Sequence, residues 1–230
     1  MRPAVLAMAV FVMGCRQVGI SNDPPMARAD GLKWVELTTT KQFSHESTMV
    51  VDIESRLPHK HPCRDEDLVT WVHEGTHYLN SRVGEEHGRP GFYLTEGRAV
   101  LLEQPDLTLK QIADYIPEHD RRTIYDTYLV KQRQWWDDRP LYLLDEWVAY
   151  GNGTACRKSL NKTGKDRIDT VRFALEMEVY VRYMARLAAK DPEYQGIDDL
   201  NNFIEWHSKR VRYLAGPEDI ALATEEMLKK

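Results

Sequence analysis

The sequence of 230 residues lacks clusters of lysine and arginine, and its formal net charge is −5. Proteins that bind nucleic acid contact the phosphates through such clusters, so this composition argues against a nucleic-acid-binding surface. Long apolar runs are also missing, since the ten residues Ala4–Met13 are too few to cross a bilayer as a helix. With 42% hydrophobic residues the chain can bury its own core, and we expect one globular domain over residues 32–230.

The first fifteen residues, MRPAVLAMAVFVMGC, have the pattern of a secretory signal, with Arg2 ahead of an apolar stretch. The ending VMGC resembles the lipobox of bacterial lipoproteins, in which the cysteine carries the lipid. On that resemblance we expect an exported protein of the bacterial cell envelope that meets the membrane only through a lipid on Cys15. A plain secretory signal with an incidental cysteine is the alternative. The polar residues 16–31 predict a flexible tether.

The strands are expected near the start of the domain. Residues 32–40 and 48–57 are rich in β-branched and apolar residues at strand length, which predicts a small sheet. Residues 65–82 predict a helix that begins at three acidic residues, and residues 84–91 predict a loop. Residues 92–105 fit a helix and a strand pair equally well.

The rest of the domain is expected to be helical. Helices are predicted over 106–117, 120–136 and 140–150, where Gly151-Asn152-Gly153 is expected to end the last of them. Apolar residues then recur every three or four positions from Ala174 to Ala188, and helices are expected over 197–214 and 218–230. The expected fold class is therefore α+β, mostly helical, with a small N-terminal sheet.

The segment TWVHEGTHYLNS at 70–81 places two histidines four residues apart, with a glutamate beside the first. Residues i and i+4 of a helix share one face, so His73 and His77 can bind a single ion. The flanking residues are uncharged, as a buried metal-binding helix requires. In this segment the chain resembles the zincin superfamily of zinc metallopeptidases. The resemblance implies one Zn²⁺ per chain on His73 and His77, Glu74 as the general base, and a peptide or protein substrate.

The third metal ligand is expected from a later helix. The metzincin continuation HExxHxxGxxH is absent, because Asn80 and Val83 stand where glycine and histidine would be needed. A glutamate ligand, the gluzincin arrangement, remains possible. Glu146 in LLDEWVAY resembles the Glu-x-x-Ala ligand helix of divergent gluzincins, including the lethal-factor-like toxins. Glu96 in YLTEGRA resembles the ligand signature of the aminopeptidase N family. The helical spacing of the apolar residues around Glu146 favours it, and Glu96 stays open as the alternative.

The three cysteines bear on the same question. With Cys15 assigned to the lipid, Cys63 and Cys156 can form a disulfide in an exported protein, and two separate thiols are the alternative. Cys63 lies ten residues before His73, and Cys156 lies ten residues after Glu146. A bridge between antiparallel helices would set His73 and Glu146 at similar heights, each about 15 Å from the bridge.

Two residues near Glu146 are candidates for supporting roles. Asp145 could contact a metal ligand, and Tyr150, one turn after Glu146, could donate a hydrogen bond to an oxyanion or belong to the core. Two functions follow from the whole pattern. The preferred one is a zinc metallopeptidase of the cell envelope. The alternative is a non-catalytic surface lipoprotein that binds a partner or cell-wall material and keeps zinc as a structural element.

Overall fold

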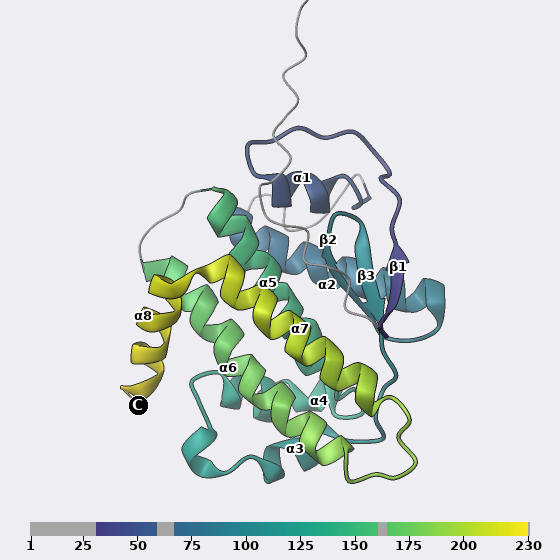
Figure 1. The fold of residues 1–230 in the computed structure, drawn as a ribbon, viewed down its shortest axis with the longest axis vertical. Helices are drawn as coiled ribbons and strands as arrows, with labels where there is room; N and C mark the ends of the chain where they lie inside the picture. The colour runs from purple at the N-terminus through teal and green to yellow at the C-terminus, as the bar shows by residue number, and fades with distance from the viewer. Residues whose placement is uncertain (1–30, 59–66, 161–164, 230) are drawn as a thin grey trace, which may run out of the picture.

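The computed structural model describes residues 31–58, 67–160 and 165–229, and most of them are helical (Figure 1). The expected fold class, α+β and mostly helical with a small sheet near the N-terminus, is confirmed. The signal segment with Cys15, residues 16–30 of the predicted tether (16–31), and Cys63 lie outside the described residues. Among the described helices, none combines the length and the apolar character that a membrane crossing needs.

The sheet has three antiparallel strands in the order β1-β3-β2. β1 (Lys33–Glu36) confirms the first predicted strand, and β2 (Gly91–Thr95) and β3 (Arg98–Leu101) form a hairpin in the stretch that had fitted two structures. The turn of this hairpin is Glu96-Gly97, and both residues have positive φ, 56° and 75°. A left-handed pair of this kind suits a tight hairpin turn.

The strand predicted at 48–57 is wrong, because this segment forms helix α1 (Thr48–Glu54). Its buried residues Met49, Val50 and Ile53 recur at helical spacing, which outweighs their β-branched character. The side chain of Ser47 caps the helix by accepting a hydrogen bond from the amide of Val50. The helical period of the buried residues and the cap at Ser47 therefore decided the local structure more than strand propensity did.

The predicted helix around the histidine motif is confirmed as α2, Leu68–His87, which begins at the capping side chain of Asp67. It is longer than expected. Gly84 lies inside the helix, and the chain leaves it only at Gly88, whose φ of 66° is the left-handed conformation that ends many helices. The predicted loop over 84–91 is therefore shorter, since α2 continues to His87 and β2 begins at Gly91.

Two further helix predictions need correction. In place of one helix over 120–136, a 3₁₀ turn η1 (Glu118–Asp120) is followed by a π-helix η2 (Asp126–Lys131) and a short helix α4 (Arg133–Trp136). The wide turn of η2 brings Tyr128 beside Tyr150 while Leu129 stays in the core. Helix α5 (Tyr142–Ser159) does not end at the glycines, and Gly151 is a spacer where a Cβ atom would come within 2.9 Å of the ring of His207.

The remaining helices confirm the predicted pattern. Helix α3 (Leu109–Tyr115) begins with a capping box at Thr108, followed later by α6 (Lys165–Ala188), α7 (Ile197–Ala215) and α8 (Pro217–Leu228). Helix α5 is central, since it packs on α2, α6, α7 and α1 (Figure 1).

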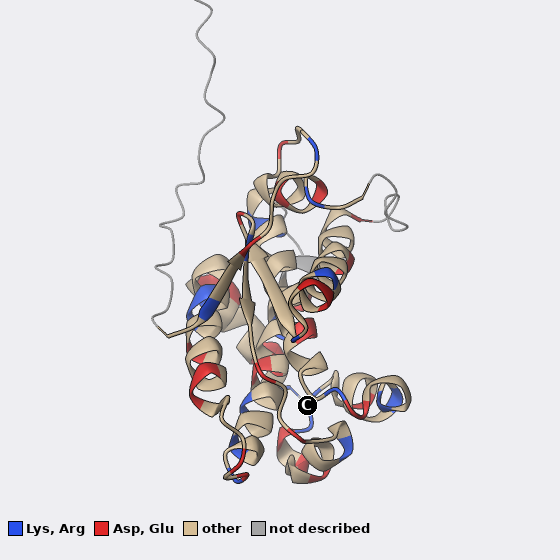
Figure 2. Cartoon of the chain, turned by 90° about the vertical axis from the view of Figure 1, so that its right-hand side faces the viewer, with Lys and Arg blue, Asp and Glu red and all other residues tan. Residues whose placement is uncertain are grey.

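The sheet lies between two hydrophobic clusters. Phe92, Leu94 and Val100 pack into the larger one with α3, α5, α6 and α7, and Tyr93 and Ala99 pack into the smaller one with α1 and α2. Acidic and basic residues are interspersed on the face seen in Figure 2. Helix α2 belongs to the smaller cluster and most of α5 to the larger, so the contact between these two helices is where the clusters meet.

Candidate metal centre

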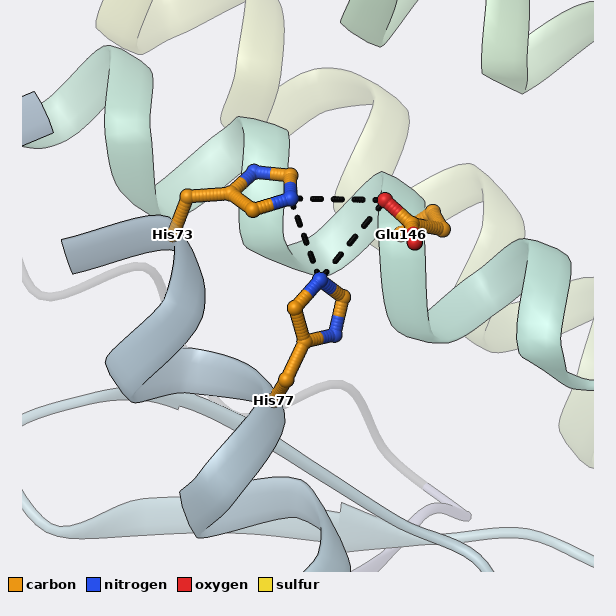
Figure 3. A group of neighbouring side chains, drawn as sticks. All are labelled: His73, His77 and Glu146. Atoms are coloured by element: carbon orange, nitrogen blue, oxygen red, sulfur yellow. Dashed lines mark hydrogen bonds and ion pairs between the residues drawn. The ribbon is translucent and has the colours of Figure 1, made fainter. Parts of the chain in front are cut away.

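Three side chains from α2 and α5 converge at the junction of the two clusters. His73 and His77 turn their Nε2 atoms toward each other at 3.0 Å, and the Oε2 atom of Glu146 lies 3.3 Å and 3.6 Å from those two nitrogens (Figure 3). Within the described part of the chain, these are the residues grouped closely enough to hold a metal ion. The structure therefore brings together the two motif histidines and the favoured glutamate.

The local sequence explains why the histidines face α5. The other side of α2 carries Trp71, Val72 and Leu79, which are buried in the smaller cluster. Gly75 lies against α1, where a Cβ atom would come within 2.7 Å of Ile53. With this face of α2 fixed by packing, the helical period directs both imidazole rings to the opposite face.

The three ligand atoms fit a tetrahedral ion. Ligands held 2.0–2.2 Å from a tetrahedral zinc ion are separated by roughly 3.3–3.6 Å, and the three distances here run from 3.0 to 3.6 Å. The Oε2 atom of Glu146 is buried and makes no hydrogen bond of acceptable geometry. A buried carboxylate oxygen without such a bond is costly unless a cation approaches it, and two imidazoles with one carboxylate are a donor set that zinc prefers.

Each of two ligands is held by a neighbour through its other polar atom. His77 Nδ1 lies 2.8 Å from Asp145 Oδ2, and the amide of Asn80 donates to the second oxygen of Asp145 at 2.5 Å. Tyr142 donates its hydroxyl to Glu146 Oε1 at 2.7 Å. With Nδ1 donating to Asp145, His77 presents the lone pair of Nε2 to the site.

The pKa values of Glu146 and His77 are shifted by burial and by the charged groups beside them. Burial alone would raise the pKa of Glu146, but the adjacent imidazoles of His73 and His77 hold that pKa well below its usual range. Burial would likewise lower the pKa of His77, and the carboxylates of Asp145 and Glu146 outweigh it, so the pKa is raised well above 6.5. A proton on His77 would do in part what a cation does at this position, and a metal ion bound at Nε2 would displace it.

The alternative ligand, Glu96, lies elsewhere. It occupies the turn of the β2-β3 hairpin, where its exposed carboxylate pairs with Arg98 at 2.9 Å. Its nearest cavity is bordered by α1 and the segment before it, away from His73 and His77. The helix around Glu146 and the hairpin around Glu96 thus account for the different positions of the two carboxylates.

The cysteine arrangement is described for one partner only. Cys156 is buried near the end of α5, with its sulfur 3.6 Å from the carbonyl oxygen of Leu68 at the start of α2. Helices α2 and α5 therefore run antiparallel, as the spacing of the cysteines and ligands had suggested. Because Cys63 lies outside the described residues, the disulfide stays a prediction.

Two cavities open on the centre from different sides. One, of about 1020 Å³, is bordered by α4 and the end of α2, and we call it the α4 cavity. The other, of about 730 Å³, is bordered by α6, and we call it the α6 cavity. His73, Glu74 and Tyr128 line both cavities. Glu74 thus borders both cavities next to the candidate ligands.

Phenol groups line the side of the centre opposite α2. The hydroxyls of Tyr128 and Tyr150 are 2.5 Å apart, and the ring of Tyr150 lies 4.7 Å from that of His73. Burial, the largest influence, raises the pKa of Tyr128, Tyr142 and Tyr150. All three phenols therefore stay protonated at neutral pH and can donate hydrogen bonds.

Sequence reasoning missed two residues of this centre. Tyr142 precedes Glu146 by one helical turn, so the periodicity that pointed to Tyr150 could also have indicated it. Tyr128 comes from a π-helix and reaches the site only through tertiary packing, so it had no local signal. Searches against protein-family models, curated proteins and solved structures found no match for the chain.

Proposed function

We propose that the protein is a zinc-dependent metallopeptidase. The observation that carries the proposal is the convergence of His73 Nε2, His77 Nε2 and Glu146 Oε2 at distances suited to a tetrahedral ion, beside Glu74 and two open cavities. Catalytic zinc sites combine three protein ligands with an accessible position of this kind. When bound, the ion would polarise the scissile carbonyl and make a water molecule more acidic.

The residues around the ion would divide the remaining work. Glu74 would accept the proton of the attacking water and transfer it to the leaving amine. Tyr150, or Tyr128 through the hydrogen bond between them, would donate to the oxygen that becomes negative in the transition state. Asp145 would keep His77 in the tautomer that binds metal, and Tyr142 would orient the carboxylate of Glu146.

The alternative, a zinc-containing lipoprotein without catalysis, would need a closed site with a fourth protein ligand. Glu96 is the other glutamate that the sequence offers as a ligand, and its pairing with Arg98 in the hairpin turn does not support a fourth position there. The described residues offer three ligands, and two cavities reach them. These observations favour an open, catalytic site.

The decisive experiment replaces Glu74 with glutamine in the zinc-loaded protein. We expect Glu74→Gln to retain one zinc ion per chain, because Glu74 is outside the ligand group, and to lose roughly 10²–10⁴-fold in kcat because the general base is gone. Zinc content by elemental analysis and cleavage of a quenched-fluorescent peptide library measure the two properties. Glu86→Gln, an exposed change on the same helix, is the matched control. Undiminished cleavage by Glu74→Gln would refute the mechanism.

A further inference from the structure

One wall of the α4 cavity is a stack of three side chains that begins at the metal centre. Tyr142, whose hydroxyl is bonded to Glu146, lies parallel to Trp136 with ring centroids 5.1 Å apart and an interplanar angle of 9°. The guanidinium carbon of Arg139 lies 5.5 Å from the centroid of Trp136. All three residues line the α4 cavity. The stack thus connects a proposed ligand to a positive charge in the same cavity.

The two arginines that line this cavity differ in their contacts. Arg89 lies 3.7 Å from Glu103, and Asp145 is engaged by His77 and Asn80. Arg139 contacts Trp136 and makes no ion pair with any residue in the described ranges. A guanidinium stacked on an aromatic ring is held in orientation, while the N–H groups in its plane remain available.

We propose that Arg139 binds a carboxylate group of the substrate in the α4 cavity. Its planar fork of donors matches a carboxylate through two parallel hydrogen bonds, and the aromatic stack reduces the entropy lost on binding. The inference rests on the proposed peptidase function, because it describes how that site would select its substrate. The carboxylate can belong to an aspartate or glutamate side chain or to the C-terminus of the peptide.

Matched peptides distinguish these two sources. Zinc-loaded wild-type protein is assayed with peptides that carry glutamate or glutamine at each position flanking the cleaved bond, each as the free acid and as the C-terminal amide. A side-chain subsite predicts a preference for glutamate over glutamine at one position, whatever the terminus. A terminal subsite predicts a preference for the free acid over the amide. Equal kcat/KM for all four forms would overturn the proposal.

Variants assign the preference to Arg139. We expect Arg139→Gln to lower kcat/KM for the preferred acidic peptide by roughly tenfold to a hundredfold, mainly through KM, and to leave its neutral counterpart almost unchanged. Arg139→Lys keeps the charge but lacks the planar pair of N–H donors, so its kcat/KM for the acidic peptide should lie between those of wild type and Arg139→Gln. Arg133→Gln removes a positive charge from α4 outside the cavity and should keep the preference. An unchanged preference in Arg139→Gln would contradict the assignment.

A binding measurement separates this inference from the proposed function. The zinc-loaded Glu74→Gln variant leaves peptides intact, so calorimetry gives its affinity for the acidic and neutral peptides with and without Arg139→Gln. If wild-type protein cleaves no peptide but acidic peptides bind about tenfold more tightly through Arg139, the peptidase proposal fails and the carboxylate site stands. If peptides are cleaved and bound without regard to acidity, the carboxylate site fails alone.

Discussion

Asp145 is the residue whose contacts most directly shape the metal centre without belonging to the ligand group. It accepts from His77 Nδ1 and from the side-chain amide of Asn80, so its carboxylate is fixed from two directions. A carboxylate in this position favours the tautomer of His77 that carries its lone pair on Nε2, and it increases the basicity of that nitrogen. In the proposed site this side chain therefore prepares His77 to bind a metal ion.

We expect Asp145→Asn to weaken zinc binding by roughly tenfold to a hundredfold, because the neutral amide supports the imidazole less well than the carboxylate does. The near-identical shape keeps the packing, so the helical content should be unchanged. Competition with a chromophoric chelator measures the affinity. Asp114→Ala, at an exposed position on α3, should bind zinc as the wild type does. Equal affinity of Asp145→Asn and wild type would contradict this role.

At the residue scale, the sequence allowed prediction of the groups that depend on local spacing. His73, Glu74 and His77 share one short motif whose helical period places both histidines on one face, and the apolar spacing around Glu146 favoured it while Glu96 stayed open. Arg139 and Trp136 had no such signal. Their relation to Tyr142 comes from a turn between α4 and α5 and from stacking, which no regular period encodes.

At the element scale, α5 continues through glycines at which the sequence predicts that the helix ends. Gly151 lies against the ring of His207 on α7, and a Cβ atom there would come within 2.9 Å of the ring. The ring itself is confined by Phe203 and Trp147, with centroids 5.6 Å and 4.5 Å away. The glycine was interpreted as a break because the sequence does not reveal which helix approaches this point.

Paired glycine substitutions test this interpretation. Gly151→Ala should lower the free energy of unfolding by about 1–3 kcal/mol, because the new methyl group overlaps a ring that cannot move. At Gly153 the nearest atoms would be 3.4 and 3.5 Å from a Cβ atom, so Gly153→Ala should be neutral or stabilise the helix by up to about 1 kcal/mol. Urea denaturation of both variants provides the comparison. A larger loss for Gly153→Ala than for Gly151→Ala would reverse the assignment.

At 48–57 the sequence predicts a strand, and the structure has helix α1 there. Its β-branched residues favoured a strand, whereas its buried positions follow a helical period and Ser47 supplies the cap. The hydroxyl of Ser47 also lies 2.6 Å from that of Ser159 near the end of α5. Tertiary contacts of this kind select between local structures that propensity leaves close in energy.

At the scale of the whole molecule, the proposed ion would join the two hydrophobic clusters, since α2 belongs to one and Glu146 lies on the part of α5 that packs in the other. His207 packs against Trp147 of the larger cluster and is fully inaccessible to solvent. Burial, and then the charge of Arg210, lower the pKa of His207 well below 6.5. Its neutral form is thus part of the folded state.

This histidine predicts a loss of global stability in acid. The unfolded chain binds a proton at His207 below pH 6.5 and the folded chain does not, so its contribution is complete above pH 6.5 and falls by up to about 1.4 kcal/mol per pH unit below it. Urea unfolding at pH 7.5, 6.0 and 5.0, with a chelator present, measures this slope. His207→Gln should be less stable at pH 7.5 and lose less stability on acidification.

The comparison isolates His207 because both proteins keep His77, whose pKa is shifted in the opposite direction. His87→Gln, at the exposed end of α2, should retain the full acid slope. If His207→Gln and wild type lose stability in parallel down to pH 5.0, another group causes the acid sensitivity.

Strand β2 lies at one edge of the sheet, where backbone groups could pair with a strand of another molecule. The side chain of Asn80 accepts from the amide of Tyr93, Asn152 donates to the carbonyl of Tyr93, and Arg210 donates to the carbonyl of Leu94. Unpaired backbone groups at a sheet edge are what let strands of separate molecules join into aggregates. Side chains from α2, α5 and α7 form hydrogen bonds with these backbone groups of Tyr93 and Leu94. These groups are therefore not available to pair with a strand of another molecule.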